Sequence, residues 1–350
     1  MNKNHGQIPM LQSGFFDLQN RFGKLDQIGD PLKALNEVVD WSVFEPILRQ
    51  GVKKEKTSNA GRPGFDPSLM FKVLILQSLY NLADGQTEFQ IRDRFTFMRF
   101  LGLTPESRIP DEKTIWLFRE NLKARAVYDK LFETFGRYLE NHGLAAKQGT
   151  VIDARLIEVP KQRNTRSENA TIKEGLMPAA WEKHTAKKVQ KDIEARWTQK
   201  NGKNYYGYKN HISIDAQHKF IRRYEVTAAN VHDSQRFERL LDRRNASPRV
   251  YADSAYRSDA HERLLKRQGF TSRVHHRTWK DQALTRRQQK ENRARSRIRA
   301  RVEHVFGHQV KSMRQTLVRG IGLARIRARI ALTNLAYNMS RLAQLRPQPA

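Results

Sequence analysis

Hydrophobic residues recur at helical spacing from Pro31 as far as His142. Apolar side chains three and four positions apart are typical of helices that bury one face. They predict helices over residues 31–40, 43–50, 66–82, 86–101, 112–122 and 126–142, with a loose polar lead before the first of them. In the helix expected over 86–101, Phe89, Phe97 and Phe100 are available to a core.

From Thr150 onward the pattern becomes that of an α/β domain. The apolar run Val151–Val159 predicts a buried strand that Pro160 ends. Residues 211–215 and 220–226 predict a hairpin, and 249–253 and 271–275 predict further strands. Helices are expected over 234–243, 258–268, 285–313 and 323–342, whereas residues 161–204 are polar and basic and read as an insertion or a mobile arm. This order of elements predicts a mixed sheet with helices packed around it.

The charge of the chain favours a polyanionic partner. The 65 Lys and Arg residues exceed the 36 Asp and Glu residues and give a formal charge of +29 with a pI of about 10.5. Such an excess costs self-repulsion, and binding to nucleic acid relieves it. Membrane binding is the other outlet, but the longest apolar run, residues 69–82, is interrupted by polar side chains and is too short to span a bilayer.

The cellular location follows from two further features. No charged segment followed by an apolar stretch occurs in residues 1–18, so no secretory signal is expected. The chain contains no cysteine, which excludes disulfides and thiolate zinc sites and suits a reducing cytoplasm. We therefore expect a cytoplasmic protein associated with the nucleoid.

Three regions are expected along the chain. Residues 1–60 form a lead and linker, residues 61–148 a helical domain and residues 149–350 the α/β domain, with a flexible basic linker over 53–64. Three short helices with a basic surface are compatible with a DNA reader of the helix-turn-helix kind. They are equally compatible with a plain bundle used for dimerisation or docking, and the sequence does not identify a recognition helix.

A basic helical run near the C-terminus contains one unexpected acid. Between Arg286 and Arg314 only Glu291 and Glu303 oppose ten basic residues, a composition suited to lying along phosphates. A carboxylate there weakens DNA binding, so Glu303 requires another reason to be present. It either holds a divalent metal against the phosphates or pairs with Arg299, four residues earlier, on a solvated helix face.

Two further acids lie at the ends of predicted buried strands, Asp153 and Asp253. Strand ends of an α/β sheet usually face a binding crevice. Together with Glu303 they supply the hard oxygen ligands that Mg²⁺ or Mn²⁺ prefers, and two ions roughly 4 Å apart activate a water or a 3′-hydroxyl. The alternatives to metal binding are that Asp153 is an ordinary turn residue and that Asp253 caps the helix that follows it. Other acids near predicted strand ends could be the ligands instead: Glu158, Asp215 and Asp233.

Short motifs spread over the chain carry a family resemblance. In chain order they are Gly61–Asp66, Thr87–Arg94, Pro110–Trp116, Ile152–Ala154, Gly207–His211, Val231–Ser234, Ala252–Tyr256 and Arg301–Phe306. From about residue 40 to the end, the chain resembles bacterial insertion-sequence transposases of the IS5 family, which belong to the DDE group. The resemblance implies an RNase H-like catalytic domain preceded by an all-α DNA-binding domain.

The resemblance also implies a site and a reaction. Asp153, Asp253 and Glu303 would be the catalytic, metal-binding triad for two Mg²⁺ or Mn²⁺ ions. The enzyme would bind the terminal inverted repeats of its element, cut the DNA and join the 3′-hydroxyl ends to target DNA, as a homodimer on paired ends. The family's signature Tyr-x2-Arg-x3-Glu-x6-Lys is only partly present, because Ser296 and Val310 occupy the tyrosine and lysine positions.

DNA contacts are expected from several side chains around this triad. Arg299 would hold a phosphate near the metals, and Lys311 lies one residue beyond the lysine position of the signature. The remaining candidates are Arg301, Arg196, Lys209 and His232. Trp197 and Trp279 either stack on an unpaired base or pack within the protein.

Overall fold

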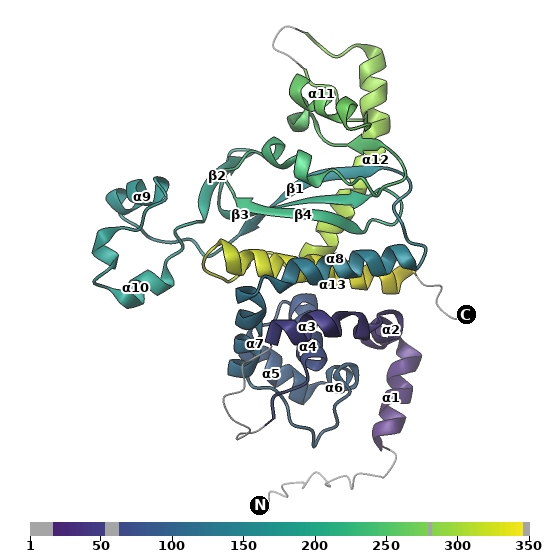
Figure 1. Cartoon of the computed structure of the whole chain (residues 1–350), viewed down its shortest axis with the longest axis vertical. Coiled ribbons are helices and arrows are strands. Elements are labelled where there is room, and N and C mark those ends of the chain that lie inside the picture. The colour runs from purple at the N-terminus through teal and green to yellow at the C-terminus, as the bar shows by residue number, and fades with distance from the viewer. Residues whose placement is uncertain (1–16, 53–62, 279–281, 346–350) are drawn as a thin grey trace, which may run out of the picture.

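The computed structural model describes residues 17–52, 63–278 and 282–345. It divides into three zones along its longest axis (Figure 1). A group of N-terminal helices forms one end, a mixed sheet lies in the middle, and α11 with the start of α12 forms the other end. The expected linker up to Arg62 and Trp279 lie outside the described residues.

The N-terminal zone is helical, as predicted. Its elements are α1 (Asp17–Ile28), α2 (Pro31–Val38), η1 (Trp41–Phe44), α3 (Glu45–Val52), α4 (Pro67–Tyr80), α5 (Asp84–Asp93), α6 (Phe95–Leu101), α7 (Glu112–Ala124) and α8 (Val127–Asn141). Local sequence sets several starts, because Asp66 accepts the Leu69 N–H at 2.9 Å and Asp111 accepts the Thr114 N–H at 2.7 Å. The expected loose lead is wrong from Asp17 onward, where α1 begins.

The single helix predicted over 86–101 is wrong, because the structure has two. Arg94, which is extended, separates α5 from α6, and its guanidinium lies over the rings of Tyr80 and Phe97. The break turns α6 inward, so Phe97 and Phe100 are buried while Phe89 on α5 is 59% exposed. In one continuous helix all three rings would share a face.

The sheet is mixed, with β1 at its centre. Its strands are β1 (Thr150–Glu158), β2 (Arg196–Lys200), β3 (Lys203–Asp215), β4 (Ile221–Ala228), β5 (Arg249–Tyr251) and β6 (Thr271–Ser272). β3 pairs antiparallel with β1 and β4, and β5 and β6 continue the sheet in parallel on the other side of β1. β2 pairs with the first part of β3. The order β4-β3-β1-β5-β6 with these directions is the RNase H-like arrangement, so the predicted fold class is confirmed.

The insertion is more ordered in its secondary structure than a mobile arm. Residues 161–204 contain α9 (Arg166–Lys173), η2 (Ala179–Trp181), α10 (Thr185–Gln190) and strand β2, and the two helices project beside the sheet (Figure 1). Trp181 is fully buried and donates its indole N–H to Glu168 at 2.6 Å. A buried aromatic ring with a satisfied donor holds these short helices together.

The helix predicted over 234–243 is also wrong. Two short 3-10 turns, η3 (Asp233–Arg236) and η4 (Glu238–Leu240), occupy that segment. Phe237, Leu240 and Leu241 are buried together in a cluster with Val250 of β5. Two 3-10 turns bury these side chains as well as a full helix would. Helical spacing of apolar residues therefore predicted the wrong element here. α11 (Asp259–Arg267) follows as predicted.

Two long helices close the described chain, α12 (Arg286–Lys311) and α13 (Leu323–Leu345). α13 contacts α2, α4 and α8 on one side and β4 on the other. One apolar cluster consequently includes Leu74 of α4, Ile212 of β3 and Leu335 of α13. The expected boundary between residues 148 and 149 therefore runs through a shared core, and each part covers apolar surface of the other.

Gly207 allows β1 and β3 to approach closely. Its φ is +149°, and a Cβ built there would lie 2.2 Å from the carbonyl oxygen of Ile157. We expect Gly207→Ala to lower the free energy of unfolding by about 3 kcal/mol or more, measured by urea denaturation. Gly143→Ala is the matched control: φ is also positive there, but no described atom lies within 4 Å. It should cost only about 1–2 kcal/mol, and equal losses would contradict the steric argument.

Candidate active site

The parallel pairing of β1 with β5 brings the two predicted aspartates to one level of the sheet. Val151 pairs with Tyr251, and each aspartate lies two residues further along its own strand direction. Because side chains two positions apart share a face, Asp153 and Asp253 emerge on the same side. α12 contacts β1 and carries Glu303 to this point.

All three acids line one cleft of about 530 Å³. They come from β1, from the loop after β5 and from α12, which are far apart in sequence. Asp253 also caps the 3-10 turn η5 (Ser254–Tyr256) by accepting the Ala255 N–H at 2.9 Å. Glu303 is 58% exposed. The cleft is therefore open to a large ligand on the side of α12.

Arg299 connects two of the three acids. Its Nη1 lies 3.0 Å from Asp153 Oδ2, and its Nη2 lies 2.8 Å from Glu303 Oε1. The ion pair between Arg299 and Glu303 on α12, one of the two roles expected for Glu303, is present. The guanidinium also pairs with Asp153 of β1. One guanidinium thus forms ion pairs with both carboxylates.

Burial raises the pKa of the Asp153 carboxyl to about 6. The negative charge of Asp253 adds to this rise. A hydrogen bond from the Ala154 N–H and the charge of Arg299 act in the opposite direction. The rise is therefore mainly a consequence of removing the Asp153 carboxylate from water.

The other acids near strand ends differ in position. Asp215 is fully buried at the end of β3, where it accepts the N–H groups of His218 and Phe220 from the turn that follows. Asp233 forms an ion pair with Lys209 at 2.8 Å. Both are engaged away from the cleft, whereas Glu158 lines it.

The cleft contains carboxylate oxygens of the kind that bind a divalent metal, and Arg299 pairs with two of the three acids. Across the residues that the structure describes, no three His, Cys, Asp or Glu side chains are placed to hold a metal ion as they stand. The positive charge between Asp153 and Glu303 is the guanidinium of Arg299. Hard carboxylate oxygens around a bound cation fit Mg²⁺ or Mn²⁺ by their chemistry.

The expected DNA contacts fall into two groups. Arg301 donates to the Ala216 carbonyl, Arg196 to main-chain carbonyls including Ile172 O at 2.8 Å, and Lys209 to Val231 O at 2.8 Å. These three side chains therefore use donors within the protein. Lys311, at the end of α12, and His232, the N-cap of η3, are both exposed.

Sequence reasoning missed part of the cleft wall. Asn201 and Tyr205 line the cleft from the β2–β3 hairpin, and Arg155 lines it from β1. The dipeptide Asn201-Gly202, with φ of 52° and 74°, is the turn signal that could have identified this hairpin. Arg155 donates to Gln315 O, and its burial lowers its pKa to about 10. Trp197, 49% exposed on β2, packs against Tyr206.

Comparison with known proteins places this architecture in a family. A family model described as "Transposase DDE domain" matches residues 145–339, and one described as "Transposase domain (DUF772)" matches residues 20–121. Among solved structures, a cryo-EM structure of a piggyBac transposase synaptic complex with hairpin DNA aligns with a TM-score of 0.45 and 11% identity, over 92% of this chain and 76% of that chain. No helix in the described ranges is long and apolar enough to span a membrane. The "Transposase DDE domain" model matches more than half of the chain, and the chain therefore belongs to the DDE transposases.

Proposed function

We propose that this transposase binds the terminal inverted repeats of its own insertion sequence, cleaves the DNA by metal-assisted hydrolysis and joins the 3′-hydroxyl ends to target DNA. The observation that carries the proposal is the convergence of Asp153, Asp253 and Glu303, from three separate elements, on one open cleft. A family of DNA-transferring enzymes supplies the reaction class. The finer assignment of roles rests on the geometry.

Asp153, Asp253 and Glu303 would hold two Mg²⁺ or Mn²⁺ ions, which when bound supply Lewis acids that activate the attacking hydroxyl and stabilise the leaving oxygen. Arg299 forms ion pairs with two of these carboxylates. Its planar fork of donors also suits a phosphate, so it can turn to the DNA backbone once the carboxylates are otherwise neutralised. Lys200, which is exposed at the cleft, adds positive charge where a strand would enter.

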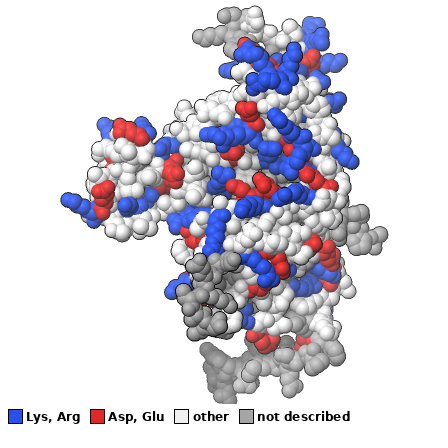
Figure 2. All heavy atoms as spheres, in the orientation of Figure 1, with Lys and Arg blue, Asp and Glu red and all other residues white. Residues whose placement is uncertain are grey.

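The chain's surface supports DNA as the partner. Lys and Arg side chains gather in patches over the middle and at the top of the face seen in Figure 2, and the whole chain has a formal net charge of +29. Phosphate neutralisation by such a surface gives strong, salt-dependent binding. Two element ends must be cut in one event, so we propose that a homodimer assembles on paired ends. The N-terminal helices would read the repeats in this assembly.

The proposal is tested with the full-length protein and DNA taken from the flanks of its gene. Labelled duplexes that carry the flanking inverted repeats should be nicked in Mg²⁺ and left intact in EDTA, whereas scrambled duplexes should not be nicked. Binding without cutting would favour a repressor or domesticated protein. Cutting that ignores the repeats would favour a structure-specific RNase H-like nuclease.

Millimolar Mg²⁺ or Mn²⁺ is expected to raise the melting temperature slightly. An ion that binds only the folded protein stabilises it by roughly 1.4 kcal/mol when it is present at ten times its Kd. The gain is small because the ion competes with Arg299. Thermal melts in Mg²⁺ and in EDTA measure it. The control is the triple variant Asp153→Asn, Asp253→Asn and Glu303→Gln, and an equal shift in that variant would place the ions elsewhere.

A further inference from the structure

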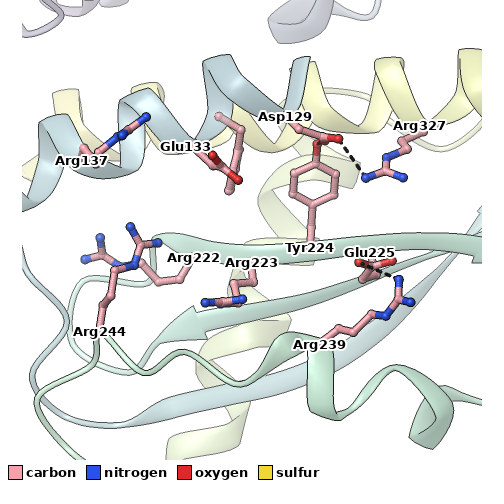
Figure 3. A pocket seen from close by; sticks show the side chains of 11 residues that line it. Asp129, Glu133, Arg137, Arg222, Arg223, Tyr224, Glu225, Arg239, Arg244 and Arg327 are labelled. Carbon is pink, nitrogen blue, oxygen red and sulfur yellow. Dashed lines mark hydrogen bonds and ion pairs between the residues drawn. The ribbon is translucent and has the colours of Figure 1, made fainter. Parts of the chain in front are cut away.

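A basic groove lies outside the cleft of the triad. It has a volume of about 390 Å³ and follows β4, with α8 on one side and the segment around η4 on the other (Figure 3). The consecutive residues Arg222–Glu225 all line it. Because neighbouring side chains of a strand point to opposite faces, the groove runs along the edge of β4. Within the described chain β4 pairs with β3 alone, so this edge has no strand partner.

Arginines dominate the lining of the groove. The described residues place six of them there against three acids, which are Asp129, Glu133 and Glu225. The arginines are Arg137, Arg222, Arg223, Arg239, Arg244 and Arg327. Figure 2, from the same side as Figure 1, shows blue side chains gathered over the middle of this face. The groove therefore has a net positive charge in a protein that already carries an excess of it.

Most of these guanidinium groups keep their donors available. Arg223 lies 3.9 Å from Asp242, Arg239 lies 3.7 Å from Glu225, and Arg244 lies 3.4 Å from Glu140. These are loose ion pairs and not hydrogen bonds of normal length. Arg137, exposed on α8, forms neither an ion pair nor a hydrogen bond with any described residue.

The acids of the groove neutralise its arginines only in part, since Glu225 pairs loosely with Arg239 and Asp129 pairs with Arg327. Asp129 accepts a hydrogen bond from the Tyr224 hydroxyl and another from Arg327 at 2.9 Å (Figure 3). Glu133 is exposed on α8 without an ion pair to a described side chain. Four arginines therefore keep donors that could bind an anionic ligand. They are Arg223 on β4, Arg137 on α8, and Arg239 and Arg244 in and after η4.

Arg222 provides a second, independent observation. Its side chain is 2% exposed, its Nη2 donates to Leu144 O, and its Nε lies 3.4 Å from Asp215. Its Nη1 is buried with no hydrogen-bond partner in the described part of the chain. Burying a charged donor without a partner is unfavourable, and a phosphate oxygen in the groove would lie next to this cation.

We propose that this groove binds the sugar-phosphate backbone of a DNA strand at a site separate from the triad. The inference rests on the proposed function, which makes DNA the partner. Arginine forks bind phosphate in two-point contacts, and the groove presents several of them in a row. The aromatic residues that line it, Phe132 and Tyr224, pack edge to face on each other at 4.9 Å. Without a free ring for stacking, the groove recognises phosphates and not bases.

Charge removal tests this site in the full-length protein. The triple variant Arg223→Gln, Arg239→Gln and Arg244→Gln should bind a short fluorescent duplex without the repeats about tenfold or more weakly, measured by anisotropy. The slope of log K against log salt should fall by about 2–3, since each phosphate contact contributes roughly 0.9. The control removes the same charge from exposed positions on α11: Arg263→Gln, Lys266→Gln and Arg267→Gln. Equal losses in both variants would overturn the assignment to the groove.

Protection of a unique thiol tests occupancy directly. The chain has no cysteine, so Glu133→Cys introduces one reactive thiol at the groove. Saturating duplex should slow its reaction with a maleimide at least several-fold. Ala260→Cys, exposed at the start of α11, should react at the same rate with and without DNA. Unchanged reactivity of both thiols would overturn the proposal.

These outcomes separate the groove from the proposed function. If the wild-type protein does not bind DNA, both proposals fall. If it binds DNA but does not cut it, only the proposed function falls, and the groove variants still test the groove. If the wild-type protein cuts its repeats but the groove variant keeps the wild-type affinity and salt slope, only the groove proposal is wrong. Sedimentation without DNA gives a third outcome: a dimer that dissociates in the groove variant would make the open edge of β4 a contact between two copies.

Discussion

Asp253→Asn is expected to reduce DNA cleavage and strand joining by about three orders of magnitude or more, while binding to the repeat DNA persists. Asparagine keeps the size of the side chain but removes the charge that would hold the metal. Loss of metal stabilisation of the transition state costs several kcal/mol, and each 1.4 kcal/mol corresponds to roughly tenfold in rate. A gel shift and a Mg²⁺ cleavage assay on the same labelled repeat DNA measure both quantities.

Asp233→Asn is the matched control, because Asp233 pairs with Lys209 and lies outside the cleft. Its rate should stay within about tenfold of the wild type. Arg299→Ala should weaken binding and cleavage moderately, because the guanidinium supplies charge and not a metal ligand. If Asp253→Asn cuts at nearly the wild-type rate, the triad is misassigned, and Glu158 becomes the next candidate since it lines the same cleft.

Leu335→Ala is expected to lower the free energy of unfolding by about 2–5 kcal/mol and to loosen both halves of the molecule at once. Leu335 is 1% exposed in the cluster that joins the N-terminal helices, the sheet and α13. Removing its side chain leaves a cavity between them. Amide hydrogen exchange should therefore accelerate in α4 and in β3 together, and chemical denaturation should still show one transition.

Leu265→Ala makes the same substitution in a different cluster. Leu265 is also 1% exposed, but it packs around β5 and α11 with residues such as Val250 and Phe237. Its cost should be similar, with the faster exchange centred on α11 and β5. If Leu335→Ala affected α13 and the N-terminal helices but left β3 at its wild-type exchange rate, the two halves would not share one core.

Local signals in the sequence predicted the elements that local chemistry sets. Asp66 and Asp111 mark helix starts that the structure confirms. The break at Arg94 could not be predicted, because it depends on which side of α6 meets the core and not on a proline or glycine. The same reason explains residues 234–243, where burial of Phe237 and Leu240 needs no full helix.

Strand ends and a family resemblance pointed to the three acids, and the structure brings them together in one cleft. The ion pair between Arg299 and Asp153 could not be predicted, because the two residues are 146 positions apart and meet only when β1 and α12 pack together. The sequence offered a choice between Arg299 as a helical partner and Arg299 as a phosphate ligand. In the structure Arg299 is the helical partner of Glu303, and it also pairs with Asp153 of the sheet.

The shared core around α13 has a consequence for the geometry of the reaction. The helices that would read the repeat and the sheet that carries the acids are packed through one apolar interior, and close-packed interiors resist deformation. The distance between the DNA-reading helices and the three acids would then be fixed by the protein. Any adjustment between the two falls to the DNA, which must bend or unwind to bring its bond to the acids.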